Sequence, residues 1–150
     1  MYNLDKMKGF DSKGERKCLE AVELVNIALK DDRFKAIFMK KKLTETLPRI
    51  GGWKTPFNNE EVINLLERAR IEFSLNYYYR WWSKVVGWTT LGGKVINVNG
   101  KYFDRTTKTG AASNILHEGA HIVGFTHNKG FSTSVPYSLN RAFEEWTSRF

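Results

Sequence analysis

The stretch that decides the fold is residues 117–127, His-Glu-Gly-Ala-His-Ile-Val-Gly-Phe-Thr-His, which holds all three histidines of the chain. Two residues four apart on a helix differ by roughly 40° of rotation, so His117 and His121 project from one face. Glu118 lies one step round the helix, beside this pair. Gly124 lets the chain leave the helix in a backbone conformation that a side chain resists, and the turn then returns the third histidine to the first two.

This spacing predicts a zinc site with His117, His121 and His127 as the metal ligands. Three neutral imidazoles leave a fourth position for water, so we expect an open, catalytic site rather than a closed, structural one. Glu118 is placed to act as the general base. The alternative is a helix whose histidines and glutamate are surface residues without a metal. The glycine and the third histidine at fitting offsets favour the metal site.

The same eleven residues resemble the zinc signature of the metzincin metallopeptidases, the clan that includes astacins, matrixins, serralysins and snapalysins. The resemblance implies a zincin-like fold, Zn²⁺ as the cofactor and hydrolysis of peptide bonds by an endopeptidase. In that clan a tight turn after the third ligand carries a methionine beneath the metal. Residues 134–138 align with this turn, but Pro136 stands in place of the methionine, and all three methionines precede the motif.

Tyr137 follows Pro136 directly. In astacins and serralysins a tyrosine just after the turn approaches the metal, so the resemblance implies a catalytic role in stabilising the oxyanion. The alternative is that Tyr137 packs beneath the ligands and holds them in place, and we favour this second role.

Length and composition fit a single metallopeptidase-like domain over residues 1–150. The hydrophobic content of 41% is enough for a packed core, and no apolar run is long enough to span a membrane. Residues 1–17 lack the apolar segment of a signal peptide, which indicates a cytoplasmic protein or export by a non-standard route. Cys18 is the only cysteine, so no internal disulfide forms, and we expect it to act as a small hydrophobic residue rather than as a latent zinc ligand.

The net charge of +8 is spread along the chain. Nucleic-acid binding is therefore open, but no motif supports it. We expect a monomer that acts on a protein or peptide substrate. Two other classes compete with this hypothesis. The first is a nucleic-acid-associated protein, either a DNA-associated, SprT-like zinc protease or a zinc-binding module without proteolysis. The second is a zinc amidase that acts on cell-wall peptides.

The pattern along the chain predicts an α+β fold with N-terminal helices, a small, mainly antiparallel sheet, the histidine helix and a C-terminal helix. Apolar spacing predicts these elements: helices over 14–29 and 31–43, a helix from Asn58 or Asn59 whose buried stripe runs to Phe73, strands over 84–89 and 94–99, the histidine helix from 109–113 to 124, and a helix over 138–148. Pro48, Gly51, Gly52 and Pro56 indicate a loop.

Two further expectations concern the substrate. Residues 100–103 continue or follow the second strand, and the metzincin resemblance makes Val95 to Tyr102 the candidate edge strand that aligns an extended peptide. An aromatic cluster, residues 77–82 with Trp88, is expected mainly in the core, with a subsite wall or a stacking surface as alternatives.

Overall fold

The computed structural model describes residues 1–43, 58–127 and 133–150, and it confirms a small, single-domain α+β fold. The elements in chain order are β1 (Tyr2–Lys8), α1 (Ser12–Lys30), α2 (Asp32–Met39), α3 (Asn59–Arg68), β2 (Ile71–Tyr78), β3 (Gly87–Thr89), β4 (Val95–Asn99), α4 (Gly100–Phe103), α5 (Lys108–Ile122) and α6 (Val135–Thr147). The expected N-caps of α2 and α3 are confirmed, because the side chains of Asp31 and Asn58 accept hydrogen bonds from the first turns. The expected loop at Pro48 to Pro56 lies outside the described residues.

The four strands form one mixed sheet in the order β1-β2-β4-β3. The expectation of a mainly antiparallel sheet is wrong: β2 pairs in parallel with both β1 and β4, and only β3 with β4 is antiparallel. The reason is that β1 and β2 are joined by α1, α2 and α3, and such a helical crossover is what parallel neighbours require. In β2 the buried residues Ile71, Phe73 and Leu75 alternate with more exposed ones, so one face of the sheet is covered. Phe73 therefore belongs to this strand and not to the helix stripe in which we expected it.

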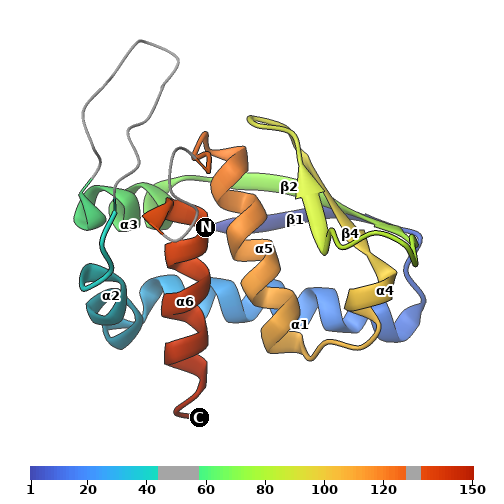
Figure 1. Cartoon of the computed structure of the whole chain (residues 1–150), viewed down its shortest axis with the longest axis horizontal. Helices are drawn as coiled ribbons and strands as arrows, with labels where there is room; N and C mark the ends of the chain where they lie inside the picture. The colour runs from blue at the N-terminus through green and yellow to red at the C-terminus, as the bar shows by residue number, and fades with distance from the viewer. Residues whose placement is uncertain (44–57, 128–132) are drawn as a thin grey trace.

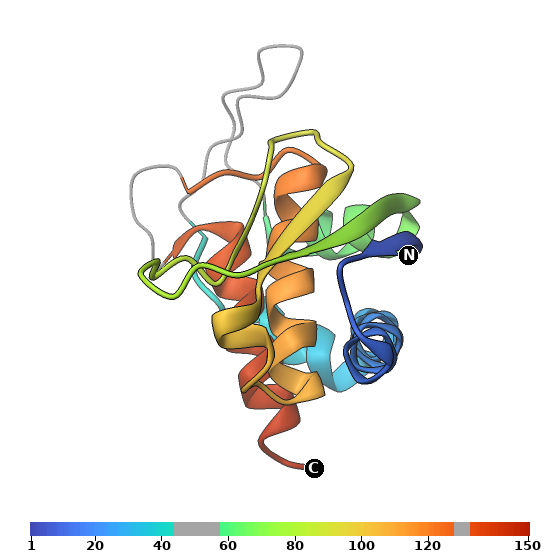
Figure 2. The ribbon, with the colours of Figure 1, turned by 90° about the vertical axis from the view of Figure 1, so that its right-hand side faces the viewer.

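Helix α5 is the central element of the helical layer. It contacts α1 on one side and α6 on the other, and it also contacts β3 and β4 (Figures 1 and 2). Its surroundings explain its composition, since nine of its residues from Ala111 to Ala120 are buried. No helix in the described part of the chain is long and apolar enough to cross a bilayer.

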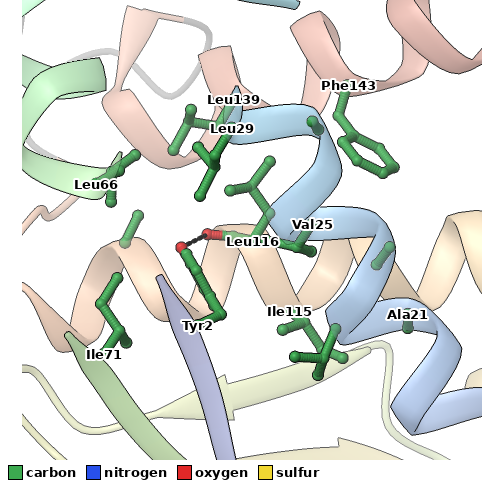
Figure 3. Packing of buried hydrophobic residues seen from close by; sticks show 14 of the residues in the cluster. Tyr2, Ala21, Val25, Leu29, Leu66, Ile71, Ile115, Leu116, Leu139 and Phe143 are labelled. Carbon is green, nitrogen blue, oxygen red and sulfur yellow. Dashed lines mark hydrogen bonds between the residues drawn. The ribbon is translucent and has the colours of Figure 1, made fainter. Parts of the chain in front are cut away.

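Strand β1 was not expected from the sequence, yet it fixes the position of α5. Tyr2 is only 1% exposed, and its hydroxyl donates a hydrogen bond of 3.0 Å to the carbonyl of Leu116 (Figure 3). One turn further along α5, Gly119 faces the Tyr2 ring so closely that an added Cβ would overlap it. The glycine of the His-Glu-Gly-Ala-His sequence thus permits close packing of the helix on β1, directly behind the two histidines.

Two expectations near β4 are also corrected. Of the two alternatives for residues 100–103, a continuation of the strand is wrong, because these residues follow β4 as the short helix α4. Strand β4 pairs on both sides, with β2 and β3, so it is not an edge strand. The outer strand beside the histidine helix is β3, which pairs with β4 along one side only.

The aromatic cluster divides between the core and the surface. Tyr77 packs edge-to-face against Phe10 and Phe103. Tyr78 is half-buried, but the expectation of a core role is wrong for four large members of the cluster, which are exposed: Tyr79 (55%), Trp81 (68%), Trp82 (66%) and Trp88 (47%). Trp81 and Trp82 contact each other in the loop before β3, but most of their large apolar surface remains in contact with solvent.

Candidate metal centre

The three histidines come from α5 and from the segment that follows it. His117 and His121 lie on α5, which ends where Gly124 adopts a φ of +109°, a conformation that favours glycine. This confirms the role expected for that glycine. The backbone N–H of Phe125 then donates to the carbonyl of Ala120, and the Phe125 side chain is fully buried. Its burial pins the turn and directs the next residues back over the helix.

The Nε2 atoms of the three rings converge on one point. Nε2 of His127 lies 3.0 Å from Nε2 of His121 and 3.3 Å from Nε2 of His117. The ligand atoms of all three residues lie within 4.8 Å of one another. Two nitrogens that are each 2.0–2.1 Å from a tetrahedral zinc ion lie about 3.3–3.4 Å apart. These histidines are therefore close enough to bind one metal ion, and their spacing is close to what such an ion requires.

The other ring nitrogens are held by oxygen acceptors, which sets the direction of each lone pair. Nδ1 of His117 lies 2.5 Å from Oδ1 of Asn140, and Nδ1 of His121 lies 2.6 Å from the carbonyl oxygen of Phe125. Both oxygens accept, so Nδ1 carries the proton and Nε2 keeps its lone pair for a metal. Nδ1 of His127 lies 3.4 Å from the hydroxyl of Ser134.

Asn140 is itself held in orientation by α5. Its side-chain NH₂ donates to the carbonyl and to the hydroxyl of Ser113, at 2.9 and 2.7 Å. The amide oxygen must therefore face His117. Neither Asn140 nor Ser134 was singled out from the sequence, because a single polar residue on the C-terminal helix carries no signal of what it contacts across the fold.

Burial favours the neutral form of the imidazoles of His117 and His127. It lowers the pKa of His117 from 6.5 to about 4, and the nearby His121 and His127 lower it further, whereas the hydrogen bond with Asn140 opposes this shift. Burial also lowers the pKa of His127. Neutral imidazoles are the protonation state that a metal ion needs, so the site is prepared for a cation before one arrives.

Glu118 lies beside the three histidines and is only 5% exposed. Burial raises the pKa of its carboxyl group from 4.5 to about 7, and a hydrogen bond from the backbone of Thr89 in β3 opposes the shift. A carboxyl group with a pKa near neutrality exchanges its proton easily, as a general base requires. The structure thus places Glu118 between the helix and the outer strand of the sheet.

Tyr137 packs on the histidine cluster. Its ring centroid lies 4.8 Å from that of His117 and 4.7 Å from that of His127, and the residue is 37% exposed. It belongs to the first turn of α6, where Ser134 is the N-cap, so residues 134–138 begin a helix and do not form a separate turn. The ring contacts support the packing role. An oxyanion role stays a prediction.

A cleft of about 630 Å³ gives access to this cluster. His117, Glu118, His127 and Tyr137 line it on one side, and residues 84–87, just before and at the start of β3, line another. Two expected metal ligands, His117 and His127, therefore line one accessible cleft with the expected base, and the third ligand, His121, lines a neighbouring pocket together with Glu118 and His127. Cys18 lies elsewhere, fully buried on α1, with its pKa raised by burial to about 12. This confirms that it packs as a small hydrophobic residue.

Comparisons of the chain with protein-family models, with curated proteins and with solved structures gave no match. The metzincin resemblance therefore rests on residues 117–127 alone and stays a prediction.

Proposed function

We propose that this protein is a zinc-dependent metallopeptidase that cleaves internal peptide bonds. The observation that carries the proposal is the convergence of three histidine nitrogens beside a buried carboxyl group, at an open cleft. Three imidazoles with a free position suit zinc among the common biological metals. Zinc at this site would supply a Lewis acid, which polarises the substrate carbonyl and lowers the pKa of a bound water.

The protein's own groups account for the rest of the reaction. Glu118 accepts a proton from the attacking water and later delivers it to the leaving amine. Asn140 and the carbonyl of Phe125 hold two histidine rings in the orientation that points their Nε2 atoms into the site. Tyr137 covers the rings of His117 and His127 on the side of the cleft.

Strand β3 is the candidate for aligning the substrate, in place of β4. It is the outer strand that contacts α5, Gly87 at its start lines the cleft, and its residues line a neighbouring pocket together with Glu118. An extended peptide that adds to such an edge gains main-chain hydrogen bonds without a strict sequence requirement. This accounts for how a small chain could hold a peptide across the histidine cluster.

The test is cleavage of a diverse peptide library by zinc-loaded protein, with Glu118→Ala as the inactive variant. Glu144→Ala is the matched control, because Glu144 lines the same cleft but is exposed and distant in sequence from the motif. We expect Glu118→Ala to bind zinc and lose about 10²–10⁴-fold in rate, and Glu144→Ala to cleave normally. Equal activity of Glu118→Ala and wild type would refute the role of this base.

A second candidate function is proteolysis or binding at nucleic acid. The exposed Trp81, Trp82 and Trp88, with a net charge of +8, favour it, because exposed aromatics and cations together bind single strands by stacking and by charge. Binding to single-stranded DNA that weakens steeply with salt would support this function. Binding that is absent at 50 mM salt would exclude it.

A further inference from the structure

A second cavity, of about 400 Å³, lies against the N-terminal half of α5. Its floor is apolar and belongs to the core, with Leu75 from β2, Phe103 from α4 and Ile115 from α5. A cavity of this size and lining suits a large apolar group. It is distinct from the cleft at the histidines, and nothing in the proposed reaction uses it.

The two spaces nevertheless adjoin each other. Val86, Gly110 and Asn114 line both of them. A ligand that extends along the cleft away from the histidines therefore reaches residues that also line the second cavity. This shared lining makes another part of the same substrate the natural occupant of the cavity.

The helix gives the distance between the cavity and the reacting bond. Ala111 lines the cavity and precedes His117 by six residues, which is about 9 Å along a helix axis at 1.5 Å per residue. An extended peptide advances about 3.3 Å per residue. The cavity therefore lies two or three residues from the bond that would be cut.

Strand β3 gives the direction. The chain approaches β3 through Val86, at the cavity, and reaches Thr89 beside Glu118. Antiparallel pairing is the more stable arrangement for an added strand. A peptide paired in this way runs from Thr89 toward Val86, so its C-terminal half, which carries the leaving amine, lies toward the cavity.

The charges at the cavity select what accompanies the apolar group. Both charged side chains among the described lining residues are cations, Lys101 and Arg105. Lys101 is partly buried and donates to the carbonyl of Ser83, whereas Arg105 is exposed. The nearest carboxylate in sequence, Asp104, accepts a hydrogen bond from the hydroxyl of Tyr77. An anionic group at the mouth would therefore meet positive charge.

We propose that this cavity is a specificity site for peptides that carry a large apolar residue next to an acidic one, two or three positions beyond the cut bond on its C-terminal side. This inference rests on the proposed peptidase function. Two properties define the site: the apolar floor fixes the side chain, and the pair of cations fixes the neighbouring acidic group.

The charge requirement is tested by Arg105→Glu, with Lys108→Glu as the matched control. Arg105 and Lys108 are both exposed and lie three residues apart, but only Arg105 lines the cavity. In library cleavage we expect wild type and Lys108→Glu to prefer peptides with Asp or Glu next to the large apolar residue that lies two or three positions beyond the cut bond. Arg105→Glu should lose this preference by about fivefold, the size expected for an exposed ion pair. An unchanged preference in Arg105→Glu would overturn the charge requirement.

The apolar requirement is tested by Ala111→Leu, which fills part of the cavity. We expect a shift of at least about tenfold from aromatic toward small side chains at that position, since pockets discriminate by this factor per methylene or more. Cleavage by wild type with no side-chain preference two or three positions beyond the cut would overturn the proposal. The test at Arg105 does not depend on the folding of this core variant.

A binding measurement separates this inference from the proposed function. The probe is acetyl-Phe-Glu-amide, with acetyl-Gly-Lys-amide as control, added to zinc-loaded protein and followed by the NMR shifts of the Phe103 and Ala111 amides, which line the cavity and not the cleft. Shifts caused by the first probe alone, without cleavage of any library peptide, would refute the peptidase function and still support the ligand class of the cavity. Absence of shifts with both probes would refute the cavity site, whatever the library shows.

Discussion

Replacing Asn140 by alanine tests whether the centre depends on residues outside the sequence motif. The substitution removes the acceptor that lies 2.5 Å from Nδ1 of His117, and it leaves that buried N–H without its partner. It also releases Ser113, to which the amide donates two hydrogen bonds. The His117 ring can then turn, or move its proton to Nε2, and both changes oppose metal binding.

Loss of such an outer partner weakens metal binding by about 10–100-fold, or about 1.4–2.7 kcal/mol. Zinc affinity would be measured by competition with a chromophoric chelator at pH 7.5. Asn140→Asp keeps an acceptor and should bind zinc about as tightly as wild type. Asn76→Ala removes an asparagine that bonds Asn97 within the sheet, so it should alter stability but not zinc affinity. If folded Asn140→Ala binds zinc as tightly as wild type, the proposed role of this residue is refuted.

Three further predictions concern Glu118, Gly119 and Tyr137. In zinc-free protein the carboxyl of Glu118 has its pKa raised by burial to about 7, so the unfolded chain loses this proton first and stability falls as pH rises from 4.5 to 7. The free energy of unfolding of Glu118→Gln, minus that of wild type, should therefore be larger at pH 8 than at pH 4, by up to about 3 kcal/mol. Thermal unfolding of both proteins in the presence of a chelator measures this difference. An equal difference at both pH values would contradict a buried carboxyl group at Glu118. Gly119→Ala should lower the free energy of unfolding by about 1–3 kcal/mol, because the new methyl group meets the ring of Tyr2, whereas a gain in stability in urea denaturation would show that β1 does not pack there. Tyr137→Phe keeps the ring that covers His117 and His127, so its zinc affinity should stay within about twofold, and a loss in kcat of about 10²-fold would show that the hydroxyl also serves the oxyanion.

The histidine helix and its end could be predicted from the sequence because local rules determine them. The four-residue spacing places His117 and His121 on one helix face, and Gly124 takes the positive φ that ends the helix. The N-caps of α2 and α3 follow from single residues, Asp31 and Asn58. Each of these features depends on neighbours within about one helical turn.

Features that depend on distant parts of the chain could not be predicted. Strand β1 has only one fully buried residue, Tyr2, so its pattern resembles that of a polar segment. Its parallel pairing with β2 joins residues that are about 70 positions apart in sequence, such as Tyr2 and Ile71. The contact of Asn140 with His117 likewise requires α6 to pack on α5.

The exposed tryptophans illustrate a different limit. Composition alone favours burial for large aromatic side chains, but Trp81 and Trp82 follow the end of β2, in a loop that leaves the sheet. Their exposure is decided by where the loop runs, which no local pattern records. The prediction that β4 is the edge strand failed for a similar reason. The order β1-β2-β4-β3 depends on how strands that are distant in the sequence pair with one another.

The most direct test of the metal centre is X-ray absorption at the zinc edge, on protein loaded with one equivalent of zinc. We expect three imidazole nitrogens and one further nitrogen or oxygen ligand at about 2.0–2.1 Å, and the loss of one imidazole in His127→Ala. A sulfur ligand at about 2.3 Å, which only Cys18 or a methionine could supply, would contradict the three-histidine site. So would zinc bound by fewer than three imidazoles in the unaltered protein.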